Sequence, residues 1–287
     1  MTSAFLRHPS AAEPELPAAP ISRKIWLAWS AVAAGLLALA CGLFLSITEA
    51  VADEPPMIAI VIDDVGLDVS AADRAADLPA AVTLALLPYA EAAPLIDAQA
   101  RGLGHETLVH VPMEPRGLAD PGPDALTTWL DADEIRARVE AALDRAPGAV
   151  GLSNHMGSRF TECATCVAPV VAAAAGRGLL VLDSVTTPDS RLAAAAERAG
   201  APALRRDVFL DNVQSADAVL SALVETEEIA LARGAAVAIG HPYPETLAAL
   251  EQWIPEAQAR GIRLVALSEL AGERDAPRAT LAALSLR

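Results

Sequence analysis

Short apolar runs alternate with longer amphipathic segments from Met57 almost to the end of the chain. Short runs rich in valine, isoleucine and leucine are typical of buried strands. The predicted strands are "MIAIVI", "AVTLALL", "ETLVHV", "AVGLSN", "LLVLDS", "AVAIG" and "RLVAL", with another inside "APALRRDVFL".

The segments between these runs have helical spacing. "DADEIRARVEAALDRAPG" has acids early, arginines later and a glycine at its end, which is typical of a capped helix. Strands that alternate with such helices predict a parallel sheet covered by helices, in an α/β fold such as a (β/α) barrel or a deformed one. An open doubly wound sheet is the alternative, but no GxGxxG follows the first strand.

A long uncharged stretch precedes this pattern. Residues 25–47 are long enough and apolar enough to cross a bilayer as one transmembrane helix. The predicted organisation is a disordered cytoplasmic tail (1–24), this membrane anchor (25–47), a linker (48–56), the main domain (57–272) and a C-terminal tail (273–287).

The charges around the anchor predict its orientation. Arg23 and Lys24 precede it, and acidic residues follow it, so we expect the main domain to lie outside the cytoplasm. "AVA" at residues 50–52 resembles a signal-peptidase site, so a cleaved signal is the alternative to a retained anchor. In both cases the domain is exported; with the anchor retained, the protein is a single-pass inner (cytoplasmic) membrane protein with its domain in the periplasm.

Composition restricts the partners. The formal net charge is −16, which excludes nucleic acid, because binding to phosphates needs a basic surface. An acidic surface also favours a neutral or cationic substrate. Cys163 and Cys166 form "CATC" without a second CxxC, which argues against a structural zinc site. In an exported domain the spacing predicts a disulfide.

Acids and histidines follow the apolar runs. They are Asp63 and Asp64 after the first run, His110 in the third, His155 in the fourth, Asp183 after the fifth and His241 after "AVAIG". Because the carboxyl ends of parallel strands meet at one mouth, we expect these side chains to converge. Carboxylates and imidazoles suit zinc or a similar divalent ion, which would also offset the repulsion between Asp63 and Asp64. One carboxylate would bind the ion while its neighbour takes a proton from water, as a metal-dependent hydrolase requires.

Each of these residues also has a structural interpretation. Paired aspartates after a strand, and Asp183, are common as helix caps, and His110 would suit an apolar core. Glu114 lies between two prolines and is a further candidate. Arg206 and Asp207, in "RRDVFLDN" with Asp211 and Asn212, either orient metal ligands or form a plain salt bridge.

Six segments together resemble the divergent polysaccharide deacetylase family, within the glycoside hydrolase/deacetylase barrel superfamily. They are "IAIVIDDVG", "GHETLVHVPMEP", "GLSNHMGSRFT", "LLVLDSVTTPDS", "RRDVFLDN" and "AIGHPYPETL", in this order from about Met57 to Leu270. The resemblance implies a deformed (β/α) barrel of the polysaccharide deacetylase type and a divalent metal, usually zinc.

The resemblance also implies roles. The superfamily's aspartate pair falls on Asp63 as base and Asp64 as ligand, and its late acidic histidine resembles His241. His110 matches the first of two ligand histidines, but Glu114 stands in the place of the second, so either His155 or Glu114 completes the set. The usual arginine–proline–aromatic and Asp-Trp motifs are absent.

Three functions are compatible with this pattern. The first is a membrane-anchored, metal-dependent deacetylase that acts on an acylated envelope carbohydrate. The second is a catalytically silent barrel that binds envelope glycan or a partner protein. The third is a glycoside hydrolase that uses Asp183 with Glu114 as its two carboxyl groups.

Overall fold

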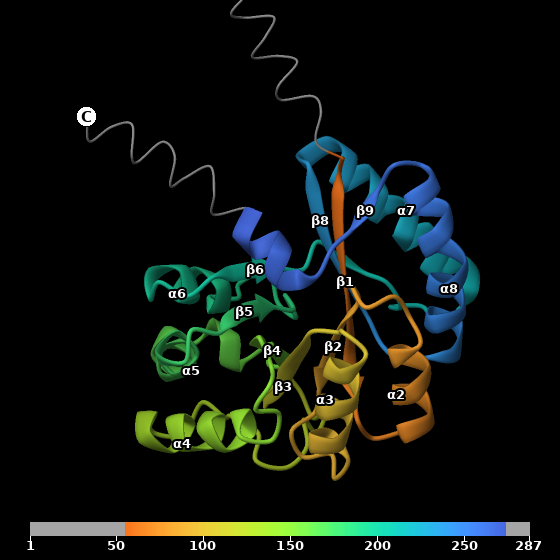
Figure 1. Cartoon of the computed structure of the whole chain (residues 1–287). Coiled ribbons are helices and arrows are strands. Elements are labelled where there is room, and N and C mark those ends of the chain that lie inside the picture. The colour runs from red at the N-terminus through yellow and green to blue at the C-terminus, as the bar shows by residue number, and fades with distance from the viewer. Residues whose placement is uncertain (1–54, 274–287) are drawn as a thin grey trace, which may run out of the picture. The chain divides into compact units, whose positions relative to one another are not determined.

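The computed structural model describes residues 55–273 of the chain (Figure 1). The predicted cytoplasmic tail, the anchor and the linker up to residue 54 lie outside the described residues, as do residues 274–287 of the predicted C-terminal tail. The anchor and its orientation therefore stay predictions. Between residues 55 and 273, no helix combines the length and the apolar character that crossing a bilayer requires.

The described residues form a nine-stranded sheet in which every paired strand is parallel to its neighbour. The strands are β1 (Met57–Val65), β2 (Thr83–Leu86), β3 (Thr107–Met113), β4 (Gly151–Met156), β5 (Leu180–Asp183), β6 (Ala203–Arg205), β7 (Val208–Phe209), β8 (Ala235–Gly240) and β9 (Arg263–Leu264). Their order is β6-β5-β4-β3-β2-β1-β8-β7, and β9 pairs with β1 outside this path.

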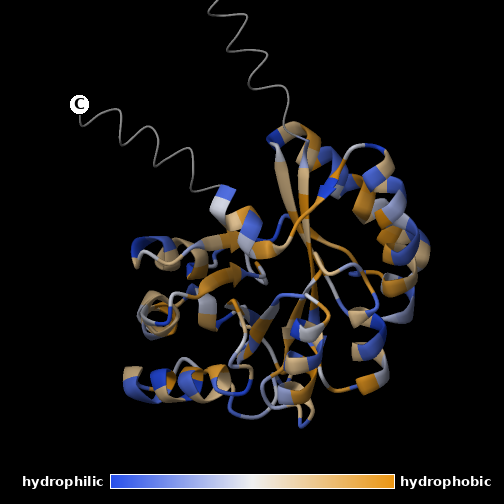
Figure 2. Cartoon of the chain, in the orientation of Figure 1, coloured by the Kyte–Doolittle hydropathy of each residue, from blue (hydrophilic) through white to orange (hydrophobic). Residues whose placement is uncertain are grey.

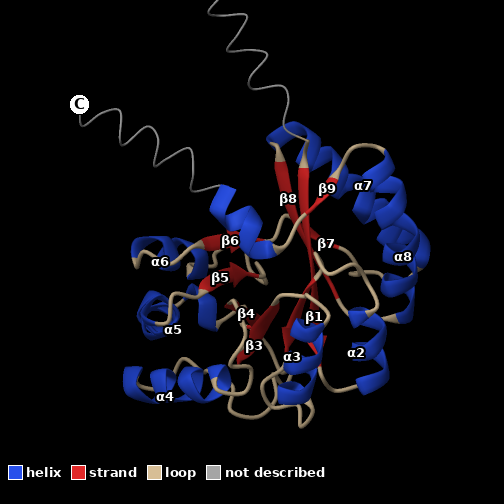
Figure 3. Cartoon of the chain, in the orientation of Figure 1, coloured by secondary structure: helices blue, strands red, loops and turns tan. Residues whose placement is uncertain are grey.

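Helices connect the strands and surround the sheet (Figure 3). They are α2 (Val69–Ala76), α3 (Ala93–Gly102), α4 (Ala132–Leu143), a 3-10 turn (Phe160–Glu162), α5 (Ala164–Gly176), α6 (Leu192–Arg198), α7 (Ala216–Arg233) and α8 (Pro244–Ala259). Local sequence explains where several of them begin. Helix α4 starts in a capping box, where Asp131 accepts from the backbone N–H of Glu134 and the Glu134 carboxylate accepts from the N–H of Asp131. Helix α8 is continuous across Pro255, although a proline inside a helix removes one backbone hydrogen bond.

Strand alternation divides the core into two layers. On β1, Ile58, Ile60 and Ile62 pack in the layer between the sheet and the helices. Ala59 and Val61 face the other way, into an inner cluster that also contains residues of β3, β5 and β8. The central strands are apolar on both faces, as Figure 2 shows, and this is typical of a parallel sheet buried on both sides.

The sheet is a half-barrel of parallel strands, consistent with a deacetylase-type barrel. Consecutive strands β6 and β7 lie at its two ends, and the two residues between them contact both ends. The N–H of Arg206 donates to the carbonyl of Asp183 in β5, and the N–H of Asp207 donates to the carbonyl of Val237 in β8. An open doubly wound sheet would carry connecting helices on both faces. Here the connecting helices α2 to α8 share one core layer, and the helical residues 267–273 at the C-terminal end pack Leu267 and Leu270 into the inner cluster.

Candidate metal and acid–base site

The inner face of the sheet changes from apolar to polar at the carboxyl ends of the strands. Because side chains alternate along a strand, the residue two positions after an inward-facing apolar side chain also faces inward. The last inward apolar residue of each strand is therefore followed, two positions later, by an inward polar residue. The pairs are Val61 and Asp63, Leu108 and His110, Leu182 and Ser184, Leu204 and Arg206, and Ile239 and His241. His110 is in register with Ser153, and Pro112 with His155, which places the β4 residues on the same face.

Asp64 departs from this alternation. As the neighbour of inward-facing Asp63 it would point away, but its φ of 58° is in the left-handed region. Few residues other than glycine adopt this region, and aspartate is among those that do. With this backbone, Asp64 Oδ1 lies 3.2 Å from His110 Nε2, and Asp63 Oδ2 lies 3.4 Å from the same nitrogen. The turn at Asp64 therefore brings two consecutive carboxylates to one histidine.

Asp64, His110 and His155 form a group whose three ligand atoms all lie within 4.8 Å of one another. His155 Nδ1 is 2.7 Å from Asp64 Oδ1. The short contacts around Asp64 Oδ1 lack hydrogen-bond geometry, so this buried oxygen has no hydrogen-bond partner, and neither has Asp63 Oδ1. Buried oxygens normally have a partner. One carboxylate and two imidazoles with unpartnered oxygens beside them fit a divalent cation such as zinc.

His110 is held from behind by a serine. Its Nδ1 lies 2.7 Å from Ser153 Oγ, and both side chains are buried. A hydrogen bond at one ring nitrogen fixes the orientation of the imidazole and directs the other nitrogen, here Nε2, toward the carboxylates. Ser153 was not among the predicted site residues. The signal was its position opposite His110 in the neighbouring strand, which only the strand pairing reveals.

The two aspartates are in different environments. Burial raises the pKa of Asp63, and the nearby histidines only partly oppose it. Burial also acts to raise the pKa of Asp64, but the imidazoles of His110 and His155 outweigh it and hold that pKa below its ordinary value. Carboxylates whose environments separate their pKa values are suited to different tasks, with Asp63 as proton acceptor and Asp64 as an anionic ligand.

His241 faces Asp64 from the opposite side of the mouth. Its Nε2 lies 3.5 Å from Asp64 Oδ2, and its Nδ1 lies 2.9 Å from Asp211 Oδ1. Asp211 is buried and also accepts from the backbone N–H of His241 and from Thr246 Oγ. Burial lowers the pKa of His241, but the hydrogen bond and the charge of Asp211 outweigh it, so the pKa lies above its ordinary value. Asp211 therefore favours the charged imidazolium, in which Nε2 carries a proton toward the mouth, as a general acid requires.

The site is bordered by strained backbone. Val185, a β-branched residue, has φ 50°, and Met156 has φ 56°. Asp183, which is fully buried, accepts from the N–H of Val185 at 2.9 Å and from Ser190 Oγ at 2.8 Å. Arg206 donates to the carbonyls of Ser184 and Val185 at 2.7 and 2.8 Å. Asp183 and Arg206 thus hold the loop that brings Ser184 Oγ to 3.5 Å from Asp63 Oδ2.

The remaining predicted residues lie elsewhere. The Glu114 carboxylate accepts from the N–H and the hydroxyl of Thr128, both at 2.7 Å, and lies 3.4 Å from Arg159. His155, and not Glu114, is the residue that lies with Asp64 and His110. Asp207 accepts from the N–H of Val237 and pairs with Arg233, so it supports the link between the ends of the sheet.

Cys163 and Cys166 are joined by a disulfide. The pair lies at the start of α5, where the backbone N–H of Cys166 contacts Cys163 Sγ. The bond closes the turn that follows the 3-10 segment after β4. It braces a loop, and neither cysteine is in the metal-ligand group.

A half-barrel of parallel strands with an aspartate pair and histidines at their carboxyl ends is consistent with a deacetylase-type barrel. The chain belongs to the divergent polysaccharide deacetylase family, whose model matches residues 60–271. The Escherichia coli protein YibQ, described as uncharacterized, is 33% identical over 197 residues, which cover 69% of this chain and 62% of YibQ. The chain therefore spans less than two thirds of the length of that relative.

Two solved structures extend the comparison. The uncharacterized protein ATU2773 from Agrobacterium tumefaciens is 31% identical with a TM-score of 0.73, and the match covers 76% of this chain and 90% of that one. A mutant of BA3943, described as a CE4 family pseudoenzyme with restored enzymatic activity, is 13% identical with a TM-score of 0.50, covering 76% of this chain and 68% of that one. At 13% identity this second likeness concerns the fold alone.

Proposed function

We propose that the protein is a metal-dependent hydrolase that removes an acyl group, with acetyl as the first candidate, from a carbohydrate of the cell envelope. The observation that carries this proposal is the aspartate pair, in which Asp64 lies against two histidines while buried Asp63 keeps one oxygen without a hydrogen-bond partner. A site that served only to hold a cation would not need the second carboxylate.

Asp64, His110 and His155 would hold the divalent cation. When bound, such an ion supplies positive charge that polarises an acyl carbonyl and lowers the pKa of water. Ser153 keeps His110 Nε2 directed at that position. The raised pKa of Asp63 suits it to accept a proton from the attacking water near neutral pH.

His241 acts on the other side of the acyl group. It donates the proton from Nε2 to the departing amine nitrogen or alcohol oxygen, and Asp211 stabilises its charged form. One water is consumed, the bond between the acyl carbon and the leaving atom breaks, and the products are a carboxylic acid and the deacylated sugar. General acid–base groups of this kind each contribute roughly 10²–10⁴-fold to the rate.

The test combines metal content with acetate release. Purified protein is analysed by elemental mass spectrometry and incubated with N-acetylhexosamine oligosaccharides. We expect about one zinc or similar ion per chain and release of acetate. Asp64→Asn should lose the ion, Asp63→Asn should keep the ion and lose turnover, and exposed Asp77→Asn should match the wild type in both.

The alternative function is a catalytically silent barrel that binds glycan or a partner. Glu114 at the place of the superfamily's second histidine is the feature that favours it. Metal and glycan binding without acetate release, for wild type as for Asp63→Asn, would support this alternative and reject the hydrolase.

We also propose that the domain works outside the cytoplasm, as the uncharged segment at residues 25–47 predicts. The Cys163–Cys166 disulfide supports this proposal, because such bonds persist in oxidising compartments. Fractionation with a protease-accessibility assay on intact spheroplasts tests it. Protection of the domain from external protease would reject it.

A further inference from the structure

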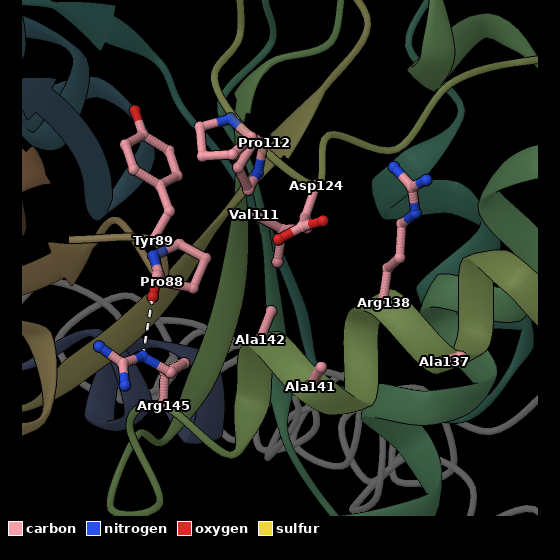
Figure 4. A pocket seen from close by; sticks show the side chains of 11 residues that line it. Pro88, Tyr89, Val111, Pro112, Asp124, Ala137, Arg138, Ala141, Ala142 and Arg145 are labelled. Carbon is pink, nitrogen blue, oxygen red and sulfur yellow. Dashed lines mark hydrogen bonds between the residues drawn. The ribbon is translucent and has the colours of Figure 1, made fainter. Parts of the chain in front are cut away.

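A cavity of about 600 Å³ lies between helix α4 and the ends of strands β2 and β3 (Figure 4). Its volume is in the range of sites for small organic ligands. One wall comes from α4 and the turn after it, and the other comes from Pro88, Tyr89, Val111 and Pro112. Pro123 and Asp124, from the loop between β3 and α4, complete the lining.

The helical wall has large side chains at its ends and small ones between them. Arg138, Ala141, Ala142 and Arg145 follow the i, i+3, i+4, i+7 spacing that places residues on one helical face. Two alanines in the middle leave open volume, and an arginine borders that volume at each end. The cavity is therefore a consequence of the sequence of α4 and of the turn that follows it.

Both arginines are half-buried, and neither lies within 4.0 Å of a carboxylate of residues 55–273. Arg138 donates to the carbonyl of Ala125 at 2.8 Å, and Arg145 donates to the carbonyls of Pro88 and Ala90, each at 3.0 Å. Carbonyl oxygens orient a guanidinium but do not neutralise it. By contrast Arg136, on the same helix, pairs with Asp133 at 2.8 Å.

The opposite wall is preformed. Two of its residues, Pro88 and Pro112, are prolines, whose φ is fixed, and Pro123 in the adjoining loop is a third. The Tyr89 ring packs against Gly122, where an added Cβ would meet ring atoms at 2.9 Å. The N–H of Gly122 in turn donates to Asp120 at 2.9 Å, which holds the loop in place. A rigid lining loses little entropy when a ligand enters.

The cavity adjoins the metal and acid–base site. Val111 packs in the layer between the sheet and the helices, on the other face of β3 from His110, so the link to the mouth runs through the loop after β2. Ala90, next to Tyr89 in that loop, lies against Gly66, two residues after Asp64, where an added Cβ would meet the Ala90 Cβ at 2.8 Å. Burial raises the pKa of Tyr89, and the negative charges of Asp64 and Asp120 add to this effect.

We propose that this cavity is a subsite for a carboxylate-bearing sugar, a hexuronate or a similar acidic unit, next to the acylated sugar of the substrate. The inference rests on the proposed function for the chemistry at the mouth. The free N–H groups of Arg138 bind the carboxylate, and guanidinium–carboxylate pairs are among the stronger polar contacts. Arg145, at the other end of the cavity and bonded to backbone carbonyls, adds positive charge. Asp124, which lies more than 4.0 Å from both guanidiniums, accepts a hydrogen bond from a sugar hydroxyl.

This subsite qualifies the expectation from net charge. A formal charge of −16 favours neutral or cationic substrates at long range. Two guanidiniums without carboxylate partners make the local electrostatic potential positive. They do so inside a cavity, where screening by salt is weaker than at the surface. We therefore expect a glycan with its acidic group at a defined distance from its acyl group.

The experiment measures affinity, so that it does not depend on turnover. The full-length Asp63→Asn protein is titrated calorimetrically with two probes: a neutral N-acetylhexosamine trisaccharide, and the same trisaccharide with one terminal primary alcohol oxidised to a carboxylate. We expect the acidic probe to bind about tenfold more tightly, as one additional charge-assisted contact provides. Arg138→Gln should abolish this preference, and Arg136→Gln should leave it unchanged. Hexuronate alone, added as a competitor, distinguishes recognition of the acidic sugar from recognition of the oligosaccharide that carries it.

Two further variants protect the test against misfolding. Arg138→Lys keeps the charge and should retain part of the preference. Ala141→Met fills the cavity without changing any charge and should also remove the preference. Equal affinity for the two probes in the parent protein, or a preference that persists in both Arg138→Gln and Ala141→Met, would overturn the subsite.

The subsite and the proposed function fail separately. If the protein binds the acidic probe more tightly but the wild type releases no acetate, the subsite is supported and the hydrolase function is rejected. If the wild type releases acetate from both probes at equal rates and the protein binds both with equal affinity, the hydrolase function is supported and the subsite is rejected.

Discussion

Asp63 and Asp64 approach the same nitrogen of His110, at 3.4 and 3.2 Å, although they are consecutive residues at the end of a strand. Alternation alone would send them to opposite faces of the sheet. The left-handed backbone at Asp64 brings them together, and the roles proposed for the pair, one as a ligand and one as a proton acceptor, depend on that one turn.

The metal-ligand group predicts stabilisation by zinc. At a free zinc concentration of about 100 times Kd, binding to the folded state adds roughly 2.7 kcal/mol to the free energy of unfolding. For a domain of this size that corresponds to a rise in Tm of about 5–10 °C. Differential scanning fluorimetry of metal-free protein with and without zinc measures it. Asp64→Asn should lose the increase, and a full increase in this variant would contradict the assigned ligand.

Ser153 should act through His110. Ser153→Ala removes the hydroxyl 2.7 Å from Nδ1 and leaves the imidazole free to rotate. We expect metal affinity or activity to fall by roughly 10–100-fold, as for other residues that orient a ligand histidine. Competition with a fluorescent zinc chelator gives the affinity. Ser158→Ala is the control, because the Ser158 hydroxyl contacts the backbone N–H of Arg116 instead; equal losses in both variants would argue against the orienting role.

Asp211 should set the alkaline limit of turnover. His241 donates a proton, so activity falls as pH rises through its pKa, which Asp211 holds above the ordinary value. In Asp211→Asn the negative charge is lost, the pKa of His241 falls, and the alkaline limb of the kcat profile moves to lower pH. The profile of kcat against pH for both proteins measures this shift. If the alkaline limb does not move, the ionisation of a group other than His241 causes the loss of activity at high pH.

Two glycine substitutions should change stability in opposite directions. Gly66 has φ 128°, and an added Cβ would meet the Ala90 Cβ at 2.8 Å, so Gly66→Ala should lower the free energy of unfolding by about 1–3 kcal/mol. Gly102 lies in α3 with no atom within 4 Å of an added Cβ. Gly102→Ala should raise the free energy of unfolding by about 0.4–1 kcal/mol, because it restricts the unfolded chain. Urea denaturation of both variants gives the values, and a loss at Gly102 as large as that at Gly66 would contradict the strain argument.

The sequence by itself determined the succession of strands and helices and the candidates at the strand ends. Apolar runs and capped amphipathic segments are local patterns, and parallel strands place their carboxyl ends together whatever their order. Asp63, Asp64, His110, His155, Asp183 and His241 could therefore be named as one group before any contact was known, although Asp183 holds the loop after β5.

Only the tertiary structure decided which of these residues meet, and what supports them. His155 lies opposite Pro112 through strand register, while Glu114 is bonded to Thr128, and sequence separation carries no information about either distance. Asp211 contacts His241, which is 30 residues away in the sequence, and Ser153 contacts His110, which is 43 residues away. Such contacts depend on how the sheet curves and how strands pair, and these follow from the packing of the whole core.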